Sequence, residues 1–293
     1  MTIGGKVELV EVGPRDGLQN EPLFIRTEDK IRLVDRLSEA GFSRIEVTSF
    51  VSPKWVPQMA DAAAVMAGIK RKENLRYAVL TPNLRGVEDA LAAGADEVAI
   101  FGAASEGFSQ KNINCSIAES LDRFYPVTRA AAEHNIPVRG YISCVIACPY
   151  DGDTLPETVA DVAETLLDMG CYEISLGDTI GAGTPHRIAA MLDCVIPRTG
   201  VSCLAGHYHD TGNQAFANID ISLEYGLRRF DSAVGGLGGC PYAPGAKGNV
   251  STLALARHLE NIGWSTGLDL TILAEIEAFI RTLGVKDKDN GNG

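Results

Sequence analysis

The sequence predicts an α/β protein: a (β/α)8 TIM barrel with a C-terminal helical appendage. Short β-rich runs alternate with amphipathic helical stretches, and eight such units fit the length of about 250 residues typical of this barrel. Polar residues also end nearly every predicted strand. An open doubly wound sheet is the alternative, but such a sheet gathers its functional residues at one switch point. The closed barrel is therefore favoured.

The strands are placed by their β-rich runs and the helices by their apolar periodicity. The eight predicted strands are residues 7–12, 44–49, 77–81, 97–102, 138–145, 172–177, 203–209 and 229–233. Helices between them include residues 30–40, 85–93, 118–134 and 158–169. Glycines stand at expected helix C-caps, namely Gly41, Gly94, Gly170 and Gly226.

The end of the chain predicts two further helices. Residues 252–261 are expected to close the barrel, and residues 270–283 to form the appendage. Residues 1–285 then make one catalytic domain, because a barrel of this size is a single domain. The tail at 286–293 is too polar to pack and is expected to be disordered.

Composition excludes several classes of function. The chain has 293 residues, of which 45% are hydrophobic and 22% charged, with a mean hydropathy of +0.03. Its net charge of -12 argues against binding to nucleic acid or an anionic membrane surface. Seven scattered cysteines suggest reduced thiols, and the N-terminal residues resemble neither a signal nor a transit peptide, so a cytoplasmic protein is expected.

Two histidines at the end of the seventh predicted strand carry the strongest chemical signal. Alternate side chains of a strand share a face, so His207 and His209 can converge while Tyr208 points the other way. Paired neutral imidazoles are ready metal ligands. The alternative is that both histidines merely form hydrogen bonds in the core.

Further ligands are expected from the other strand ends. Asp16, which follows the first strand, offers a hard oxygen, and Asn249 could add a carbonyl oxygen. Two nitrogen and two oxygen ligands suit Mg²⁺ or Mn²⁺ better than structural zinc. Asp16 has a competing role as a turn residue, because Asp before Gly is common in turns.

Charged residues at the same rim predict catalysis. Arg15 is a fixed cation that can meet charge developing on a substrate oxygen, or simply a structural partner of Glu46 or Asp178. Glu46 lies within a barrel strand, where a carboxylate is costly unless it is paired or ligating. Asp178 follows the sixth strand and is expected at the same site.

A glycine-rich loop after the eighth strand, residues 235–249, contains Cys240. Such a loop can carry a thiol to a substrate, and a nearby metal and imidazoles could lower the pKa of that thiol. Cys240 could instead be a small buried residue, and the glycines could cradle a phosphate.

Together these segments resemble the 3-hydroxy-3-methylglutaryl-CoA lyase family over nearly the whole chain. The matching segments are VGPRDGLQNE at 12–21, TSFVSPKWVPQM at 48–59, IFGAASE at 100–106, KNINCS at 111–116 and GCYEISLGDTIG at 170–181, with the histidine pair and the cysteine loop. Tyr208 departs from many relatives, and no cysteine follows Cys240, so the tail-thiol redox control of some animal relatives is not expected.

The resemblance implies a metal-dependent lyase that splits 3-hydroxy-3-methylglutaryl-CoA into acetyl-CoA and acetoacetate by a retro-Claisen reaction. By position it implies two sets of residues. The metal ligands are Asp16, His207, His209 and Asn249, and the catalytic groups are Arg15, Glu46, Asp178 and Cys240. The proton acceptor is left open between Asp16 and His207. Lys111 and Asn112, expected in the loop after the fourth strand, are candidate contacts for CoA.

Two other functions compete with the lyase. One is a synthase or aldolase of the same barrel superfamily, which shares the early Arg-Asp and the His-x-His but lacks the Gly-Gly-Cys-Pro-Tyr loop. The other is a non-catalytic barrel that binds an acyl-CoA or a metal, which would require the loss of a catalytic position. The expected partner is an acyl-CoA rather than nucleic acid or membrane, and a homodimer is expected.

Overall fold

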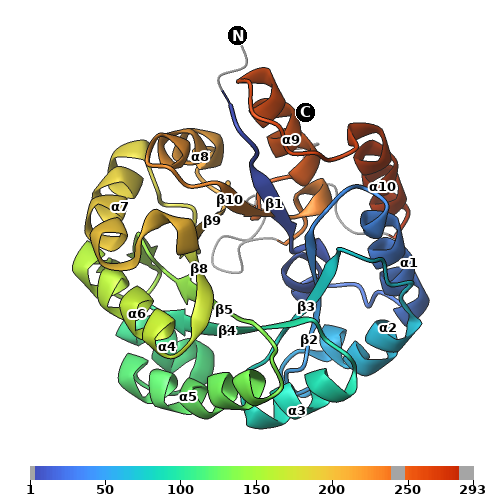
Figure 1. Ribbon diagram of the computed structural model, residues 1–293, viewed down its shortest axis with the longest axis horizontal. Coiled ribbons are helices and arrows are strands. Elements are labelled where there is room, and N and C mark those ends of the chain that lie inside the picture. The colour runs from blue at the N-terminus through green and yellow to red at the C-terminus, as the bar shows by residue number, and fades with distance from the viewer. Residues whose placement is uncertain (1–3, 239–247, 284–293) are drawn as a thin grey trace.

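The computed structural model, which describes residues 4–238 and 248–283, contains a closed barrel of eight parallel strands (Figure 1). The strands follow one another around the ring in the order β1-β10-β9-β8-β5-β4-β3-β2. Their bounds are β1 Glu8–Glu11, β2 Arg44–Ser49, β3 Arg76–Leu80, β4 Glu97–Ala103, β5 Val138–Ser143, β8 Cys171–Asp178, β9 Leu204–Tyr208 and β10 Arg229–Ser232. Pairing of β1 with both β2 and β10 closes the ring.

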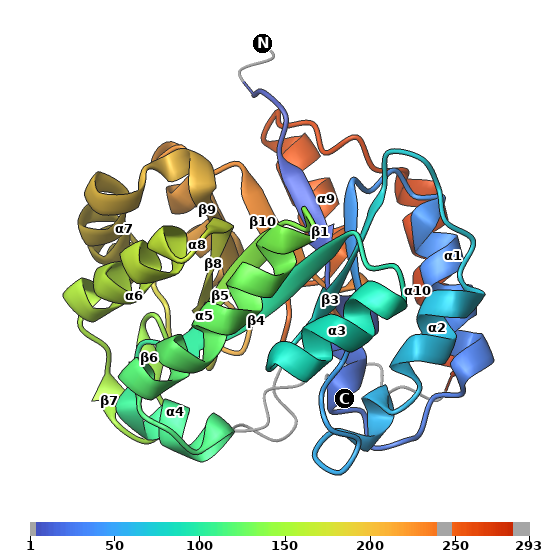
Figure 2. The ribbon, with the colours of Figure 1, turned by 60° about the horizontal axis from the view of Figure 1, so that its bottom comes forward.

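Helices surround the strands on the outside (Figures 1 and 2). They are α1 Thr27–Ser38, α2 Ala62–Gly68, α3 Leu84–Ala92, α4 Glu106–Ile113, α5 Ile117–Glu133, α6 Pro156–Asp168, α7 Pro185–Thr199, α8 Ala215–Glu224, α9 Thr252–Asn261 and α10 Leu270–Thr282. Their apolar faces and the outward side chains of the strands form one large hydrophobic cluster. Burial of this layer is the main favourable contribution to folding.

The predicted barrel is confirmed, and each of the eight predicted strands overlaps an observed one. Closure rules out the open doubly wound sheet, since an open sheet has two edge strands. The four expected helix-capping glycines all have positive φ angles: Gly41 at 94°, Gly94 at 73°, Gly170 at 105° and Gly226 at 97°. A residue with a Cβ rarely adopts this conformation, which explains glycine at these helix ends.

The two C-terminal helices lie where the sequence predicts them. α9 follows β10, and α10 packs against α1 and α9 (Figure 1). α10 buries Leu273, Ile276, Phe279 and Ile280, all of which belong to the main hydrophobic cluster. The additional helix is thus integrated into the outer layer of the barrel.

Two segments differ from the sequence-based expectation. The fourth strand is followed by α4, so Lys111 and Asn112 lie on an exposed helical turn and not in a loop. Ser105 caps this helix by accepting a hydrogen bond from the Phe108 N–H at 3.1 Å. A small hairpin of β6 (Ala147–Cys148) and β7 (Gly152–Asp153) also follows β5. Both segments lie at the lower end of Figure 2, toward which the strands run.

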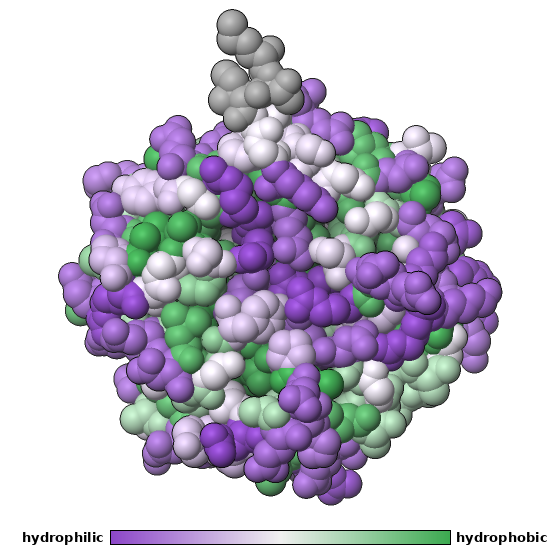
Figure 3. All heavy atoms as spheres, in the orientation of Figure 1, coloured by the Kyte–Doolittle hydropathy of each residue, from purple (hydrophilic) through white to green (hydrophobic). Residues whose placement is uncertain are grey.

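The interior of the barrel is unusually charged. Barrels of this kind are commonly filled by branched apolar side chains. Here, near the amino ends of the strands, Arg44 pairs with Glu173 at 3.0 Å and with Glu97 at 3.4 Å. Figure 3, which has the orientation of Figure 1, shows hydrophilic residues gathered over the centre of the ring. The barrel is therefore filled partly by an ionic network.

Among the described residues, no helix is both long and apolar enough to cross a membrane.

Candidate active site and metal centre

Asp16, His207 and His209 meet at the carboxyl ends of the strands. Each offers one ligand atom, and these atoms lie within 4.8 Å of one another, as a metal ion would require. His207 Nε2 is 4.0 Å from Asp16 Oδ2, and the two imidazole centroids are 5.3 Å apart. The alternation of side chains along β9 brings the histidines together, while the Tyr208 hydroxyl contacts Ser222 of α8 at 2.9 Å. The spatial convergence predicted for these three residues is confirmed.

Asp16 reaches the site from η1 (Gly13–Gly17), a single wide helical turn that follows β1. The N–H groups of Asp16 and Gly17 donate to the Val12 carbonyl at 2.8 and 3.2 Å. A Cβ at Gly17 would approach Leu237 Cβ to 2.6 Å, so this turn requires glycine to pack against η4 (Val234–Gly236) and Leu237. Asp16 is thus a turn residue and a candidate ligand at once.

The charge state of Asp16 suits a ligand. Burial alone would raise the pKa of its carboxyl, but Arg15, the two histidines and a hydrogen bond from Asn249 lower it to about 2. The carboxylate is therefore ionised at neutral pH. The same property makes it a weak base, so Asp16 is poorly suited to accept a proton from substrate.

Asn249 lies beside the three candidate ligands. It pairs with His209 in an isolated antiparallel bridge. Its side-chain Nδ2 donates to Asp16 Oδ2 at 2.7 Å and to the Leu237 carbonyl at 3.1 Å. The amide nitrogen therefore faces Asp16, and coordination through Oδ1 would require the amide to turn over.

Arg15 is paired with two carboxylates. Its Nε donates to Glu46 Oε2 and its NH1 to Asp16 Oδ1, each at 2.6 Å. Its guanidinium also lies 5.4 Å from the centroid of the Tyr141 ring. Burial opposes the charged form, but Glu46 and Asp16 outweigh burial and raise the pKa of Arg15. The structural and catalytic roles are thus compatible: a permanent cation is held in one orientation beside the candidate metal site.

Glu46 is almost completely buried on β2, with 1% of its surface exposed. Burial raises the pKa of its carboxyl despite the opposing effect of Arg15. Glu46 Oε1 has no hydrogen-bond partner among the described residues. One carboxylate oxygen thus orients Arg15, and the other is buried with no hydrogen-bond partner among the described residues.

Asp178 does not point toward the same centre. Its carboxylate accepts hydrogen bonds from the N–H groups of Ala182 at 3.0 Å and Gly183 at 2.8 Å. Ser175, three residues earlier on β8, bonds Asp231 inside the barrel at 2.7 Å, so Asp178 lies on the opposite side of the strand. The expectation that its side chain shares the rim with Arg15 needs correction: Asp178 stabilises the loop after β8.

Cys240 lies outside the described residues, as does the rest of 239–247. The two ends of that segment are described. The Asn249 N–H donates to the Gly238 carbonyl at 3.2 Å, and a Cβ at Gly238 would lie 3.3 Å from the carbonyl oxygen of Asp16. The segment therefore begins and ends beside the turn that carries Asp16.

Sequence reasoning missed three residues around His207. Asp231 accepts a hydrogen bond from His207 Nδ1 at 3.0 Å, Arg139 binds Asp231, and the Tyr141 ring packs edge-on against His207 with centroids 6.0 Å apart. A signal was present, since Arg139 and Asp231 are charged residues within predicted barrel strands. Like Glu46, both are charged side chains inside a barrel, where a charge is costly unless it is paired.

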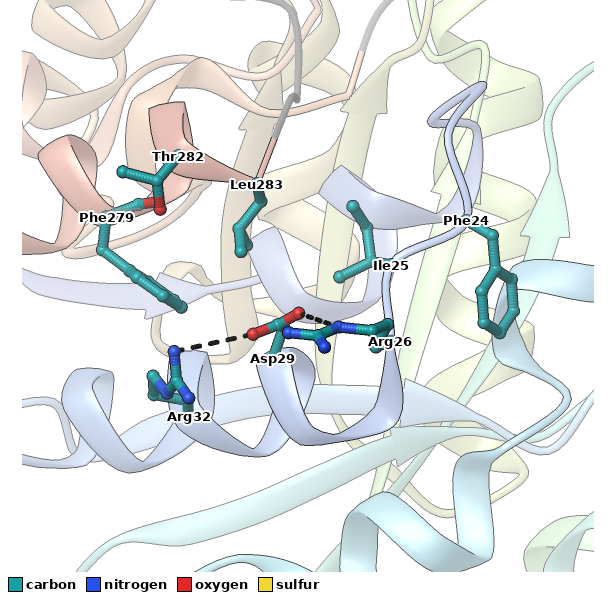
Figure 4. Close-up of a pocket in the computed structure, with 8 residues that line it drawn as sticks. All are labelled: Phe24, Ile25, Arg26, Asp29, Arg32, Phe279, Thr282 and Leu283. Atoms are coloured by element: carbon teal, nitrogen blue, oxygen red, sulfur yellow. Dashed lines mark hydrogen bonds and ion pairs between the residues drawn. The ribbon is translucent and has the colours of Figure 1, made fainter.

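A separate cavity of about 390 Å³ lies outside the barrel between α1 and α10 (Figure 4). It is lined by Phe24, Ile25, Arg26, Asp29, Arg32, Phe279, Thr282 and Leu283. Its two arginines are paired with Asp29, Arg26 at 2.8 Å and Arg32 at 3.6 Å. None of these lining residues belongs to the metal-ligand group, so the carboxyl end of the barrel is the better candidate for catalysis.

The fold and this site define the class: a (β/α)8-barrel enzyme with a candidate metal centre at the carboxyl ends of its strands. The chain belongs to the HMGL-like family, whose model matches residues 6–280.

Several relatives match over nearly the whole of this chain. A Pseudomonas aeruginosa protein named 3-hydroxy-3-isohexenylglutaryl-CoA/hydroxy-methylglutaryl-CoA lyase is 56% identical over 292 residues, which cover 100% of this chain and 97% of the relative. The crystal structure of the Brucella melitensis HMG-CoA lyase has a TM-score of 0.95 and 58% identity, and the match covers 96% of this chain and 99% of that one. An Acinetobacter baumannii HMG-CoA lyase, in complex with coenzyme A and 3-methylmalate, has a TM-score of 0.92 and 35% identity, with coverage of 98% and 96%.

Proposed function

We infer that this protein is a carbon-carbon lyase that cleaves 3-hydroxy-3-methylglutaryl-CoA into acetyl-CoA and acetoacetate. The observation that carries this inference is the convergence of Asp16, His207 and His209 beside the Arg15–Glu46 pair. That arrangement occurs in a chain 56% identical, over its whole length, to a relative whose name includes this lyase activity.

We propose Asp16, His207, His209 and Asn249 as the ligands of a Mg²⁺ or Mn²⁺ ion. The donor set fits such an ion, because it combines an ionised carboxylate with two imidazoles whose ligand atoms lie close together. When bound, the divalent cation would orient the substrate and lower the pKa of its hydroxyl.

Cleavage requires a defined movement of charge. The tertiary hydroxyl loses its proton to a base, the C2–C3 bond breaks, and its electron pair passes to the thioester as an enolate. The former alcohol carbon becomes the ketone of acetoacetate, and the enolate carbon takes up a proton to give acetyl-CoA. The chain must therefore supply a base, a cation for the enolate oxygen and an acid.

Arg15 is the residue we propose for the enolate oxygen. It is buried, permanently charged and held by Glu46 and Asp16, so it needs no reorganisation as charge develops. For the base, the low pKa of Asp16 argues against that residue. Glu46 is better suited, since burial raises the pKa of its carboxyl and its Oε1 makes no hydrogen bond to any described residue.

Cys240 remains our proposal for the acid that protonates the enolate carbon. The positions of Gly238 and Asn249 support this role, because they place both ends of its segment next to Asp16. Lys111 and Asn112 remain candidate contacts for CoA, since α4 lies at the carboxyl end of the barrel (Figure 2) and exposes both side chains.

The decisive experiment incubates the protein with 3-hydroxy-3-methylglutaryl-CoA and Mg²⁺ and measures acetoacetate. We expect acetoacetate from the wild type and from Cys194→Ser, a matched thiol change on α7, and strongly reduced turnover from Cys240→Ser. An absence of acetoacetate from the wild type would reject the lyase. Condensation of acetyl-CoA with an oxoacid instead would favour a synthase.

The same assay addresses the breadth of substrate. The name of the Pseudomonas relative includes a 3-hydroxy-3-isohexenylglutaryl-CoA activity. Supplying that longer acyl-CoA as an alternative substrate would show by the ratio of the two kcat/KM values which one this chain prefers.

Three further expectations remain proposals. We propose one catalytic domain over 1–285, which limited proteolysis would test, and a homodimer, which light scattering coupled to gel filtration would test. A cytoplasmic location is supported by six described cysteines that form no disulfide, and cell fractionation would test it.

A further inference from the structure

Asp231 is a buried carboxylate on β10 that is saturated with hydrogen bonds. Its Oδ2 accepts from His207 Nδ1 at 3.0 Å, from Ser175 Oγ at 2.7 Å and from Arg139 NH1 at 3.0 Å. Its Oδ1 accepts from Arg139 NH2 at 2.8 Å. Only 2% of the Asp231 surface is exposed. Its position is therefore fixed by three different strands.

This arrangement determines which nitrogen of His207 is available. Because Asp231 can only accept at this contact, Nδ1 carries the hydrogen and Nε2 keeps its lone pair. Nε2 is also the atom that faces Asp16, at 4.0 Å. A hydrogen bond on the far side of a ligating imidazole fixes both its tautomer and the plane of its ring.

Arg139 holds Asp231 in turn. Its two terminal nitrogens bind the two oxygens of Asp231, and its Nε donates to Glu173 at 2.7 Å. Glu173 lies 3.0 Å from Arg44, which belongs to the ionic network at the amino end of the barrel. The guanidinium is thus bound along two of its edges and cannot rotate without losing charge-assisted hydrogen bonds.

We propose that Asp231 and Arg139 are positioning residues that hold His207 with Nε2 directed at the divalent cation. The inference rests on the proposed metal centre and extends it from the ligands into the barrel interior. The buried ion pairs inside the barrel then do more than fill its interior: they also hold a metal ligand in place. It forms a rigid support that runs from Arg44 through Glu173, Arg139 and Asp231 to the ligand.

Asp231→Asn is the sharpest substitution, because either orientation of the amide breaks the arrangement. With its NH2 toward His207, the amide favours the tautomer with hydrogen on Nε2, which blocks coordination. With its oxygen toward His207, the NH2 faces the N–H groups of Arg139. We expect the dissociation constant for Mn²⁺ to rise about 10- to 100-fold, measured by the electron paramagnetic resonance of free Mn²⁺.

Asp29→Asn is the matched control. Asp29 is also a buried carboxylate paired with arginines, Arg26 at 2.8 Å and Arg32 at 3.6 Å, but it lies on α1 and contacts no member of the support. Its loss should leave the Mn²⁺ dissociation constant unchanged. Equal weakening of Mn²⁺ binding in both variants would overturn the proposal.

A second measurement does not depend on the folding of Asp231→Asn. Long-range ¹H–¹⁵N correlation spectra of the metal-free wild type, at a pH where His207 is neutral, should place its ring hydrogen on Nδ1. Hydrogen on Nε2 would overturn the proposal.

Arg139→Lys should weaken Mn²⁺ binding less than Asp231→Asn, since one ammonium group keeps the charge but cannot bind both oxygens in parallel.

The outcomes separate this inference from the proposed function. If the wild type binds no Mn²⁺, the metal centre itself is wrong and this inference falls with it. If the wild type binds Mn²⁺ and Asp231→Asn binds it equally well, the inference alone is wrong.

Discussion

Arg15 links the candidate metal ligand Asp16 to the candidate base Glu46. It contacts Asp16, a candidate ligand, and Glu46, a candidate base, through separate edges of one guanidinium. Each carboxylate is thus oriented by the same cation, and the cation is itself held between them. A neutral side chain at this position could keep one contact but could not supply the positive charge.

We therefore expect Arg15→Gln to lower kcat by about 10²- to 10³-fold, which is typical for the loss of one donor to a developing oxyanion. Arg15 is not among the three residues of the ligand group, and a glutamine amide can keep one hydrogen bond to Asp16, so the Mn²⁺ dissociation constant should stay close to that of the wild type. Steady-state kinetics and Mn²⁺ titration measure the two effects. Arg198→Gln, which breaks an exposed pair with Glu164, should change neither. Parallel loss of turnover and Mn²⁺ binding would argue against this division of roles.

Among the elements, the contact of η1 with η4 determines where Asp16 stands. Gly17 packs directly against Leu237, which comes just before the segment that contains Cys240. A small residue is needed because two backbone segments approach closely at this point. The turn that carries Asp16 is therefore packed directly against Leu237, with no room for a side chain at Gly17.

Gly17→Ala should cost about 1–3 kcal/mol of unfolding free energy, the usual effect of overpacking, and should also weaken Mn²⁺ binding by displacing Asp16. Thermal unfolding and Mn²⁺ titration test both effects. Gly5→Ala is the control, because its nearest neighbour would be Trp264 at 3.7 Å, an ordinary contact. Unchanged Mn²⁺ affinity in Gly17→Ala would mean that Asp16 is positioned without this contact.

The buried carboxylate of Glu11 is hydrogen-bonded to the first residues of three different helical elements. Its carboxylate accepts hydrogen bonds from Gly13 N at 2.8 Å, Val234 N at 2.9 Å and Thr252 Oγ1 at 2.7 Å, at the starts of η1, η4 and α9. Burial outweighs these hydrogen bonds and raises the pKa of Glu11 from 4.5 to about 7. The folded protein thus binds a proton at this carboxyl more tightly than the unfolded chain does.

This difference predicts a pH dependence of stability. The contribution of Glu11 is fully present below pH 4.5 and is lost as the pH rises to about 7, a change of about 3 kcal/mol. In Glu11→Gln, which does not titrate, this loss should be absent. Urea unfolding of both proteins between pH 5 and 8 should therefore show the advantage of the wild type shrinking as the pH rises. A constant difference would contradict the elevated pKa.

At the scale of the whole molecule, the candidate centre collects residues from both ends of the chain. Asp16 follows β1, whereas His209 and Asn249 come from the last third of the sequence. An ion bound between them would link the turn after β1 to the end of β9 and to the segment after β10, on either side of the β1–β10 pairing that closes the barrel. Metal binding should therefore stabilise the fold as a whole.

Mn²⁺ at about 100 times its dissociation constant should add about 2.7 kcal/mol to the free energy of unfolding. Tm should rise by several degrees in a chain of this size, and a chelator should reverse the rise. His209→Ala should lose this effect, whereas His134→Ala, at the end of α5, should keep it. Differential scanning calorimetry makes the comparison. An equal rise in both variants would place the metal elsewhere.

Individual residues show which parts of the candidate site could be predicted from the sequence. The His-x-His spacing and the buried charge of Glu46 were sufficient to predict a polar site at the carboxyl ends of the strands. Asp231 and Arg139 also lie in predicted strands, but their contact with His207 depends on the register of three strands, which local sequence does not specify. Asp178 was placed on the wrong side of β8, since a residue at a strand end can turn either way.

The amino-acid sequence by itself determined the repeating order of strands and helices, because that order follows from local propensity and from the period of apolar residues. It also determined which residues could act as metal ligands, since that is a property of the side chain. The tertiary structure decided which carboxylate faces which cation and which nitrogen of His207 is available. These depend on strand register and closure of the ring, which bring together residues as distant as Asp16 and Asn249.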